Sequence, residues 1–159
     1  MGGKDIIIPI RELKRRGFKG KVFVVNRKRL KIENYKCLRK ISDLPLSPDA
    51  AFIAVPASEV ISTVKELKAA KCKGIVCYSA GFKETGKTGK YLEDNLIKEC
   101  GDIPLIGPNC YGFINFSDNV ALWPFSHKGA RCKKGIALIT QSGMLSSDII
   151  MATRSLPIS

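Results

Sequence analysis

DAAFIAVPASEVISTVKELKAAKCKGIVCYSA, residues 49–80, decides the fold class, because it reads as a strand, a helix and a second strand in succession. Residues 49–55 are an unbroken apolar run, which is typical of a strand buried on both faces. Apolar residues then recur at helical spacing, with Pro56 at the helix entry, Ser58 as the expected N-cap and Gly74 at the exit. A second apolar run follows Gly74. The order predicts a βαβ unit with parallel strands.

The same alternation continues on both sides of this unit. Strands are expected at residues 21–26, 49–55, 74–80, 103–107 and 135–140, and further helices from about Ile8 to Gly17, at 89–100 and after Ser142. A basic connection through Lys31 joins the first two of these strands. The chain is therefore predicted to be an α/β protein with a parallel sheet. Ligands of such sheets bind at the carboxyl ends of the strands, where the loops lie.

Length and charge narrow the possible functions. The chain has 159 residues, enough for one ordinary domain, and a formal net charge of +13. No apolar run is long enough to cross a bilayer and no secretory signal opens the sequence, so we predict a soluble, cytoplasmic protein. The first 40 residues hold 14 Lys and Arg against 3 Asp and Glu. This basic segment suits a polyphosphate ligand, a nucleic acid or an acidic partner, or it is only a solvated surface.

Cysteine and histidine give no pattern of a metal or catalytic site. The six cysteines are scattered and His127 is the single histidine, so no metal site is predicted. Cys110 could act as a nucleophile only with an activating base, and the sequence shows no evident one. A role of His127 as phosphoryl acceptor or general base is not favoured either, because its neighbours suggest a flexible loop. We therefore assign no catalytic residue, and expect the cysteines to be reduced and packed as small apolar side chains.

Four corners that follow predicted strands are expected to lie side by side at one sheet edge. They are VVNRK, VPAS, SAGFKETGKTG and GPNCYG, which begin at residues 24, 55, 79 and 107. A nucleotide bound there would meet small residues and prolines, with Lys28 near its phosphates. A fifth corner, TQSGML, places Ser142 and Gly143 at a helix N-terminus. Phosphate binding and simple capping by Ser142 both remain open there.

Five stretches in order carry a family resemblance: GFKGKVFVVN, DLPLSPDAAFIAVPA, SAGFKETGKTG, LIGPNCYGFIN and GIALITQSGML. Across about residues 2–153, the chain resembles the CoA-binding part of NDP-forming acyl-CoA synthetases. This group includes the ADP-forming acetate–CoA ligases and the α subunit of succinyl-CoA synthetase. The resemblance implies a Rossmann-like CoA-binding domain at 1–124, without the family's first strand, then a linker at 125–134. Residues 135–159 would be the first βα unit of a flavodoxin-like ligase domain.

The resemblance also implies roles for individual residues. The implied CoA contacts are Asn26 and Lys28 in one loop, Val55 and Pro56 beside the adenosine, Ala80, Gly81 and Phe82 facing the pantetheine arm, and Pro108 and Asn109 near the thiol. Cys110 would be structural. Gln141, Ser142 and Gly143 match the family's phosphate-binding helix start. Arg27 departs from the family pattern, which usually has proline at this position.

The family's complete enzymes convert acyl-CoA, phosphate and NDP into free acid, CoA and NTP through an acyl phosphate and a phosphohistidine. The phosphohistidine segment and the nucleotide-grasp domain would lie outside this sequence, so ADP, ATP and Mg²⁺ are implied for the complete enzyme only. The chain is expected to bind CoA or acyl-CoA and to need the remaining domains or subunits for catalysis. A non-catalytic CoA-sensing module is the alternative. Nucleic-acid binding, suggested by Phe18, Phe23 and Tyr35 among basic residues, is a weaker interpretation.

Overall fold

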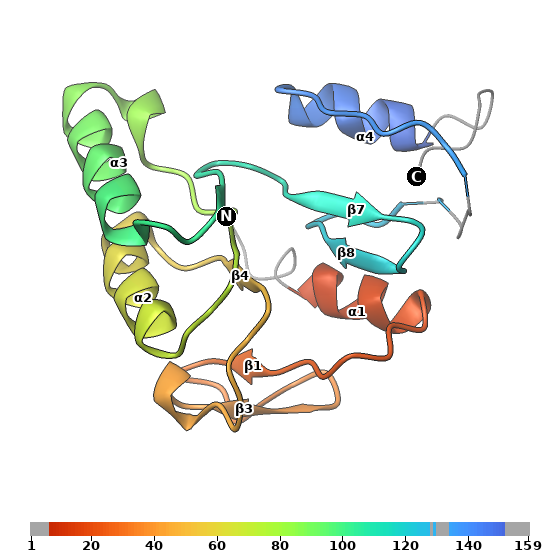
Figure 1. The fold of residues 1–159 in the computed structure, drawn as a ribbon, viewed down its shortest axis with the longest axis horizontal. Helices are drawn as coiled ribbons and strands as arrows, with labels where there is room; N and C mark the ends of the chain where they lie inside the picture. Colours follow the sequence, from red (N-terminus) through yellow and green to blue (C-terminus); the bar gives the residue numbers. More distant parts are fainter. Residues whose placement is uncertain (1–6, 128, 130–133, 152–159) are drawn as a thin grey trace. The chain divides into compact units, whose positions relative to one another are not determined.

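The computed structural model describes residues 7–127, 129 and 134–151. The chain divides into two compact units, one formed by Val22–Gly112 and the other by Met1–Lys21 together with Phe113–Ser159. Each unit is described by itself, and Figure 1 follows the chain through both of them. No helix among the described residues has the length and apolar character needed to span a membrane.

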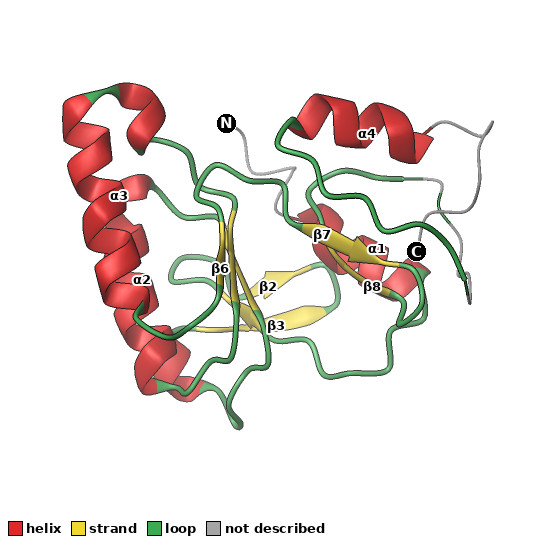
Figure 2. Ribbon diagram, turned by 45° about the horizontal axis from the view of Figure 1, so that its top comes forward, coloured by secondary structure: helices red, strands yellow, loops and turns green. Residues whose placement is uncertain are grey.

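A parallel sheet with two helices on one face forms the centre of Val22–Gly112. Its strands are β4 (Ala51–Ile53), β5 (Ile75–Cys77) and β6 (Leu105–Ile106), in that order, and the helices are α2 (Ala57–Ala69) and α3 (Lys87–Cys100). Both helices lie on the same side of the sheet in Figure 2. The predicted α/β fold with a parallel sheet is confirmed, although each strand is shorter than its apolar run.

Helical spacing explains which face of α2 is buried. Val60, Val64 and Leu67 recur at intervals of four and three residues and are at most 4% exposed. They pack with apolar residues of the strands and of α3 in one core. The buried members are Ile41, Ile53, Val60, Val64, Leu67, Cys72, Ile75, Cys77, Phe82, Leu96 and Cys100. This core holds the strand ends, and hence the loops that follow them, in place.

Pro56 stands at the entry of α2 as expected, but the expected N-cap at Ser58 and the expected exit at Gly74 are wrong by a few residues. The N-cap is Pro56, and Ser58 is already the second helical residue, without a side-chain cap bond. The helix ends at Ala69, and the chain reverses at Lys71, which has φ 58°. Gly74 instead lies just before β5. Proline's fixed φ suits a helix entrance, and this explains why the helix starts before the serine.

A second small sheet precedes the first one in the chain. It contains β1 (Val24–Val25), β2 (Lys31–Ile32) and β3 (Tyr35–Leu38), in the order β1-β3-β2. β1 and β3 are parallel, while β2 and β3 form an antiparallel pair whose turn includes Glu33 at φ 51°. The basic connection through Lys31 therefore contains a strand pair that was not predicted. The short helix η2 (Ile41–Asp43) follows β3.

The other unit contains α1 (Ile8–Arg15), the antiparallel pair β7 (Phe113–Asn115) and β8 (Val120–Leu122), and α4 (Gly143–Met151). α1 starts at Ile8 with Pro9 in its first turn and ends before Gly17, as predicted. The expected strand over 135–140 is wrong, since only an isolated bridge at Ile136 is present. Ile139 is 98% exposed. Among the described residues no neighbouring strand extends this bridge into a ladder, and an apolar run without a ladder partner does not become a strand.

Candidate functional site

Three corners at the carboxyl ends of β4, β5 and β6 are joined by one buried serine. The Ser79 hydroxyl donates to the carbonyl of Val55 at 2.6 Å, and the Ser79 carbonyl accepts from the Asn109 N–H at 2.9 Å. Ser79 is only 7% exposed. Because each strand contributes one partner, the corners that carry the predicted CoA contacts are brought together as a single sheet edge.

The Gly-Pro-Asn-Cys corner after β6 depends on close backbone approach. Gly107 has φ 109°, and a Cβ on this residue would lie 2.4 Å from the Cys77 carbonyl oxygen. The next turn is made by Asn109 at φ 53°, in the left-handed region that asparagine tolerates better than most residues. The Cys110 N–H then donates to the same Cys77 carbonyl at 3.4 Å. The corner places Asn109 on the surface, with Pro108 half-buried behind it.

The corner after β5 already holds an anion of its own chain. Gly81 has φ 107°, and its N–H donates to Oε1 of Glu84 at 2.6 Å. Desolvation alone would raise the pKa of Glu84, but hydrogen bonds from the backbone N–H groups of Gly81, Glu84 and Phe82 outweigh it and lower that pKa. Ala80 is exposed, whereas the Phe82 side chain is completely buried in the core. Only the backbone of Phe82 is therefore available at this corner.

The loop after β1 is shaped by its own side chains. Oδ1 of Asn26 accepts from the backbone N–H groups of Lys28 and Arg29 at 2.9 and 2.8 Å. Arg39, directly after β3, donates from Nη1 to the Arg27 carbonyl at 2.7 Å. Asn26 thus fixes the loop conformation with its side-chain oxygen, and Lys28 is left exposed.

Arg27 links the same loop to α2. Its guanidinium lies 3.2 Å from the Glu66 carboxylate and 3.9 Å from that of Glu59. All three side chains are at least 38% exposed, so these ion pairs position the loop more than they stabilise the fold. Arginine at this position, where the resembled family usually has proline, thereby ties the Lys28 loop to a helix.

The fifth corner belongs to the other compact unit. The Ser142 hydroxyl accepts from the Leu145 N–H at 3.3 Å, so Ser142 caps α4. The Thr140 hydroxyl donates to the Ser142 carbonyl at 2.9 Å. Gln141 is exposed and Gly143 is the first residue of the helix. Capping accounts for the hydroxyl of Ser142, and a phosphate role for this corner stays a prediction.

His127 itself is buried, although its sequence neighbours suggest a flexible loop. Its side chain is 1% exposed, and Nε2 lies 3.2 Å from Oε2 of Glu12, itself 4% exposed. Nη2 of Arg16 lies 3.2 Å from Nδ1, and the Phe116 ring meets the imidazole edge-on. Burial, reinforced by the charge of Arg16, lowers the pKa of His127 to about 4. A neutral, enclosed imidazole of this kind serves packing and has no access to a substrate.

The described cysteines behave as packed apolar side chains. Cys37, Cys72, Cys77 and Cys100 are buried free thiols, and Cys110 is half-buried. Burial raises the pKa of Cys77 to about 11, which disfavours its thiolate. Cys132 lies outside the described residues. Within the part of the chain that the structure describes, no three His, Cys, Asp or Glu side chains are grouped to hold a metal ion.

Sequence reasoning missed two residues that shape this edge, Ser79 and Arg39. Each acts through a backbone carbonyl of a segment distant in sequence, 24 residues away for Ser79 and 12 for Arg39. No spacing rule identifies such a contact. Ser79 is the first residue of the glycine-containing corner, and this position was the one available signal.

Comparison with known proteins gives a consistent result. The family model described as "CoA binding domain" matches residues 8–115. Acetate–CoA ligase [ADP-forming] I of Archaeoglobus fulgidus is 38% identical over 80% of this chain and 19% of its own length. The α subunit of acetate–CoA ligase [ADP-forming] II of Pyrococcus furiosus is 34% identical over 84% of this chain and 29% of its own length.

Solved structures agree with the family match. The apo form of a dinucleotide-forming acetyl-coenzyme A synthetase from Candidatus Korarchaeum cryptofilum aligns with a TM-score of 0.82 at 29% identity, over 94% of this chain and 33% of that one. A Pyrococcus horikoshii protein aligns with a TM-score of 0.80 at 33% identity, over 92% of this chain and 32% of that one. The chain thus spans no more than a third of these four proteins. With the family model matching 108 consecutive residues, the chain belongs to the CoA-binding domain family.

Proposed function

We propose that the chain binds CoA at the sheet edge formed by the corners after β4, β5 and β6, together with the loop after β1. The observation that carries this proposal is the Ser79 link, which fixes Val55 and Asn109 relative to each other in a chain of the CoA-binding domain family. A pre-formed edge with exposed backbone and small residues suits a long, flexible ligand.

Individual roles follow from the chemistry of each position. Lys28 is proposed to meet a phosphate of CoA, because its exposed ammonium projects from a loop that Asn26 and Arg39 hold in one shape. Val55 and Pro56 are proposed to form the wall beside the adenosine. Ala80, Gly81 and the backbone of Phe82 would face the pantetheine arm. Pro108 and Asn109 would lie near the thiol.

We further propose that the chain is the CoA-binding portion of an ADP-forming acid–CoA ligase. The two ligase relatives above support this, and the fraction of them that the chain spans suggests that further domains or subunits supply the catalytic groups. ADP and Mg²⁺ would act in that complete enzyme. Residues from 135 onward are proposed to begin the next domain, with Gln141, Ser142 and Gly143 near phosphate.

Calorimetric titration of CoA into the 159-residue chain tests the binding proposal directly. We expect saturable binding that Lys28→Ala weakens by about tenfold, which corresponds to the loss of one charge-assisted phosphate contact. Asn109→Gly keeps the left-handed backbone while removing the amide, and should weaken binding as well. Dephospho-CoA shows whether the 3′-phosphate is recognised.

Lys98→Ala is the matched control, because Lys98 is an exposed lysine on α3 outside the proposed site. It should bind CoA like the unmodified chain. A folded chain that does not bind CoA contradicts the proposal. Equal weakening by Lys28→Ala and Lys98→Ala would instead indicate a nonspecific charge effect.

A further inference from the structure

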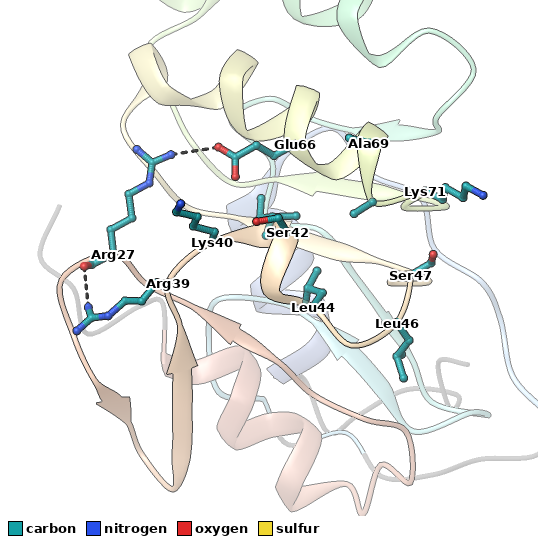
Figure 3. A pocket seen from close by; sticks show the side chains of 12 residues that line it. Arg27, Arg39, Lys40, Ser42, Leu44, Leu46, Ser47, Glu66, Ala69 and Lys71 are labelled. Atoms are coloured by element: carbon teal, nitrogen blue, oxygen red, sulfur yellow. Dashed lines mark hydrogen bonds and ion pairs between the residues drawn. The ribbon is translucent and has the colours of Figure 1, made fainter.

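A groove of about 930 Å³ runs between α2 and the segment that follows β3, within Val22–Gly112 (Figure 3). The end of α2 and the residue after Ala70 supply one wall, and η2 with its flanking residues supplies the other. The lining residues are Arg27, Arg39, Lys40, Ile41, Ser42, Leu44, Leu46, Ser47, Glu66, Ala69, Ala70 and Lys71. The volume is typical of sites for small organic ligands.

Positive charge dominates one end of the groove. Figure 3 shows Arg27, Arg39 and Lys40 gathered there, with Lys71 at the opposite end. The single carboxylate in the lining, Glu66, pairs with Arg27 at 3.2 Å. No ion pair joins Lys40 or Lys71 to a carboxylate within residues 7–127. The groove therefore carries an excess of positive charge that an anionic ligand would neutralise.

Apart from Lys71, the other end of the groove is lined mainly by apolar side chains. Leu44 and Leu46 belong to the lining there, and Leu46 is 43% exposed although it is a large apolar side chain. On the opposite wall the small side chains of Ala69 and Ala70 leave room for a ring. The hydroxyls of Ser42 and Ser47 supply polar partners along the lining. A ligand with an apolar, planar body would bury this exposed surface.

We propose that this groove is a second binding site, for a nucleoside diphosphate or triphosphate. The phosphates lie among Arg27, Arg39 and Lys40, and the base packs against Leu44, Leu46 and Ala69. The charges of Arg39 and Lys40 match those of the phosphates, whereas Arg27 already pairs with Glu66, and the base matches the apolar end. None of the residues proposed to bind CoA lines this groove, although Arg27 and Arg39 also hold the loop that carries Lys28.

Calorimetric titration of ADP into the complete chain, with and without saturating CoA, tests the proposal. We expect ADP to bind in both conditions, and pyrophosphate to bind about tenfold more weakly, since it has charge but no apolar body. Lys40→Glu should weaken ADP binding by about tenfold by reversing a charge at the phosphate end. Ala69→Phe should weaken it by filling the apolar end.

The matched charge control is Lys98→Glu, on a part of α3 outside the groove, and it should bind ADP normally. CoA titrations of the same variants separate the two proposals. Retained CoA binding with no ADP binding overturns the groove inference alone, whereas ADP binding without CoA binding overturns the proposed function alone. Loss of ADP binding when CoA is added, or equal affinities for ADP and pyrophosphate, also overturns the inference.

Discussion

Ser79 is hydrogen-bonded to two neighbouring corners. Its side-chain hydroxyl donates to the Val55 carbonyl, and its backbone carbonyl accepts from the Asn109 N–H. Replacing it by alanine leaves the backbone bond to Asn109 possible but removes the donor to Val55. We expect Ser79→Ala to lower the free energy of unfolding by about 1–2 kcal/mol, because a buried hydrogen bond is lost and its acceptor is left without a partner. Urea unfolding followed by far-ultraviolet circular dichroism measures this change.

Ser62→Ala provides the control for the loss of a hydroxyl. The Ser62 hydroxyl also donates to a backbone carbonyl, that of Glu59 at 2.9 Å, but on the exposed side of α2. Its removal should change the free energy of unfolding by less than about 0.5 kcal/mol. The same pair of variants should differ in CoA affinity, with Ser79→Ala the weaker binder. Equal stabilities would contradict the role given to Ser79.

At the scale of single elements, the corner after β6 requires glycine for two separate reasons. Gly107 has φ 109°, and an added Cβ would lie 2.4 Å from a backbone oxygen, whereas Gly86 has φ 92° with open space around it. Gly86→Ala therefore measures the backbone strain alone. Gly107→Ala adds the overlap with the Cys77 carbonyl and should cost at least about 2 kcal/mol more. Urea unfolding of the two variants in parallel gives the difference.

Comparable losses in both variants would show that β5 and β6 shift apart without cost, contrary to the tight corner. If Gly107→Ala does not fold, the loss of the cooperative unfolding transition in this variant alone, with Gly86→Ala intact, supports the same conclusion. CoA affinity of Gly86→Ala should remain close to that of the unmodified chain, because Gly86 lies outside the proposed contacts.

The sequence was most informative where one residue pattern has one physical solution. The apolar run at 49–55, the helical spacing that follows it and the next apolar run correctly predicted β4, α2 and β5. The β2–β3 hairpin was missed, because its short strands alternate with exposed lysines and carry little periodic signal. The run at 135–140 was misread, because strand formation depends on a partner that a single segment does not reveal.

For the candidate site, the positions of the corners were predictable from the sequence, but the orientations of their side chains were not. Three of the four corners were placed correctly because they follow neighbouring strands of one sheet, so Gly81, Pro108 and Asn109 do lie at one edge. The corner after β1 follows a strand of the other small sheet. Which side chains face outward was less predictable. Phe82 is fully buried in the core, although the resemblance placed it at the ligand. Burial of that ring depends on α3 packing over it, which no local pattern shows.

At the scale of the whole molecule, the chain closes one of its units by a contact between segments more than a hundred residues apart. Arg16 meets His127 at a separation of 111 residues, and Arg15 donates to the His127 carbonyl at 2.8 Å. Glu12 and the Phe116 ring complete the surroundings of the imidazole. The buried cluster fastens α1 to the chain after β8, and its electrostatics predict how that unit responds to acid.

The native unit favours neutral His127, because its pKa is lowered from an ordinary 6.5 to about 4. The lowered pKa of His127 makes its full contribution to the free energy of unfolding above pH 6.5. This contribution is lost as the pH falls towards 4, because the histidine of the unfolded chain takes up a proton at a higher pH than the buried one. The free energy of unfolding falls by at most about 3 kcal/mol over this range.

The fluorescence of Trp123 during urea unfolding measures this change, because Trp123 is the single tryptophan, is 5% exposed and lies in the same unit. In His127→Gln the residue cannot titrate, so the pH dependence between 6.5 and 4.5 should become shallower than in the unmodified chain. Identical slopes for both proteins would show that His127 is not held neutral by its burial beside Arg16.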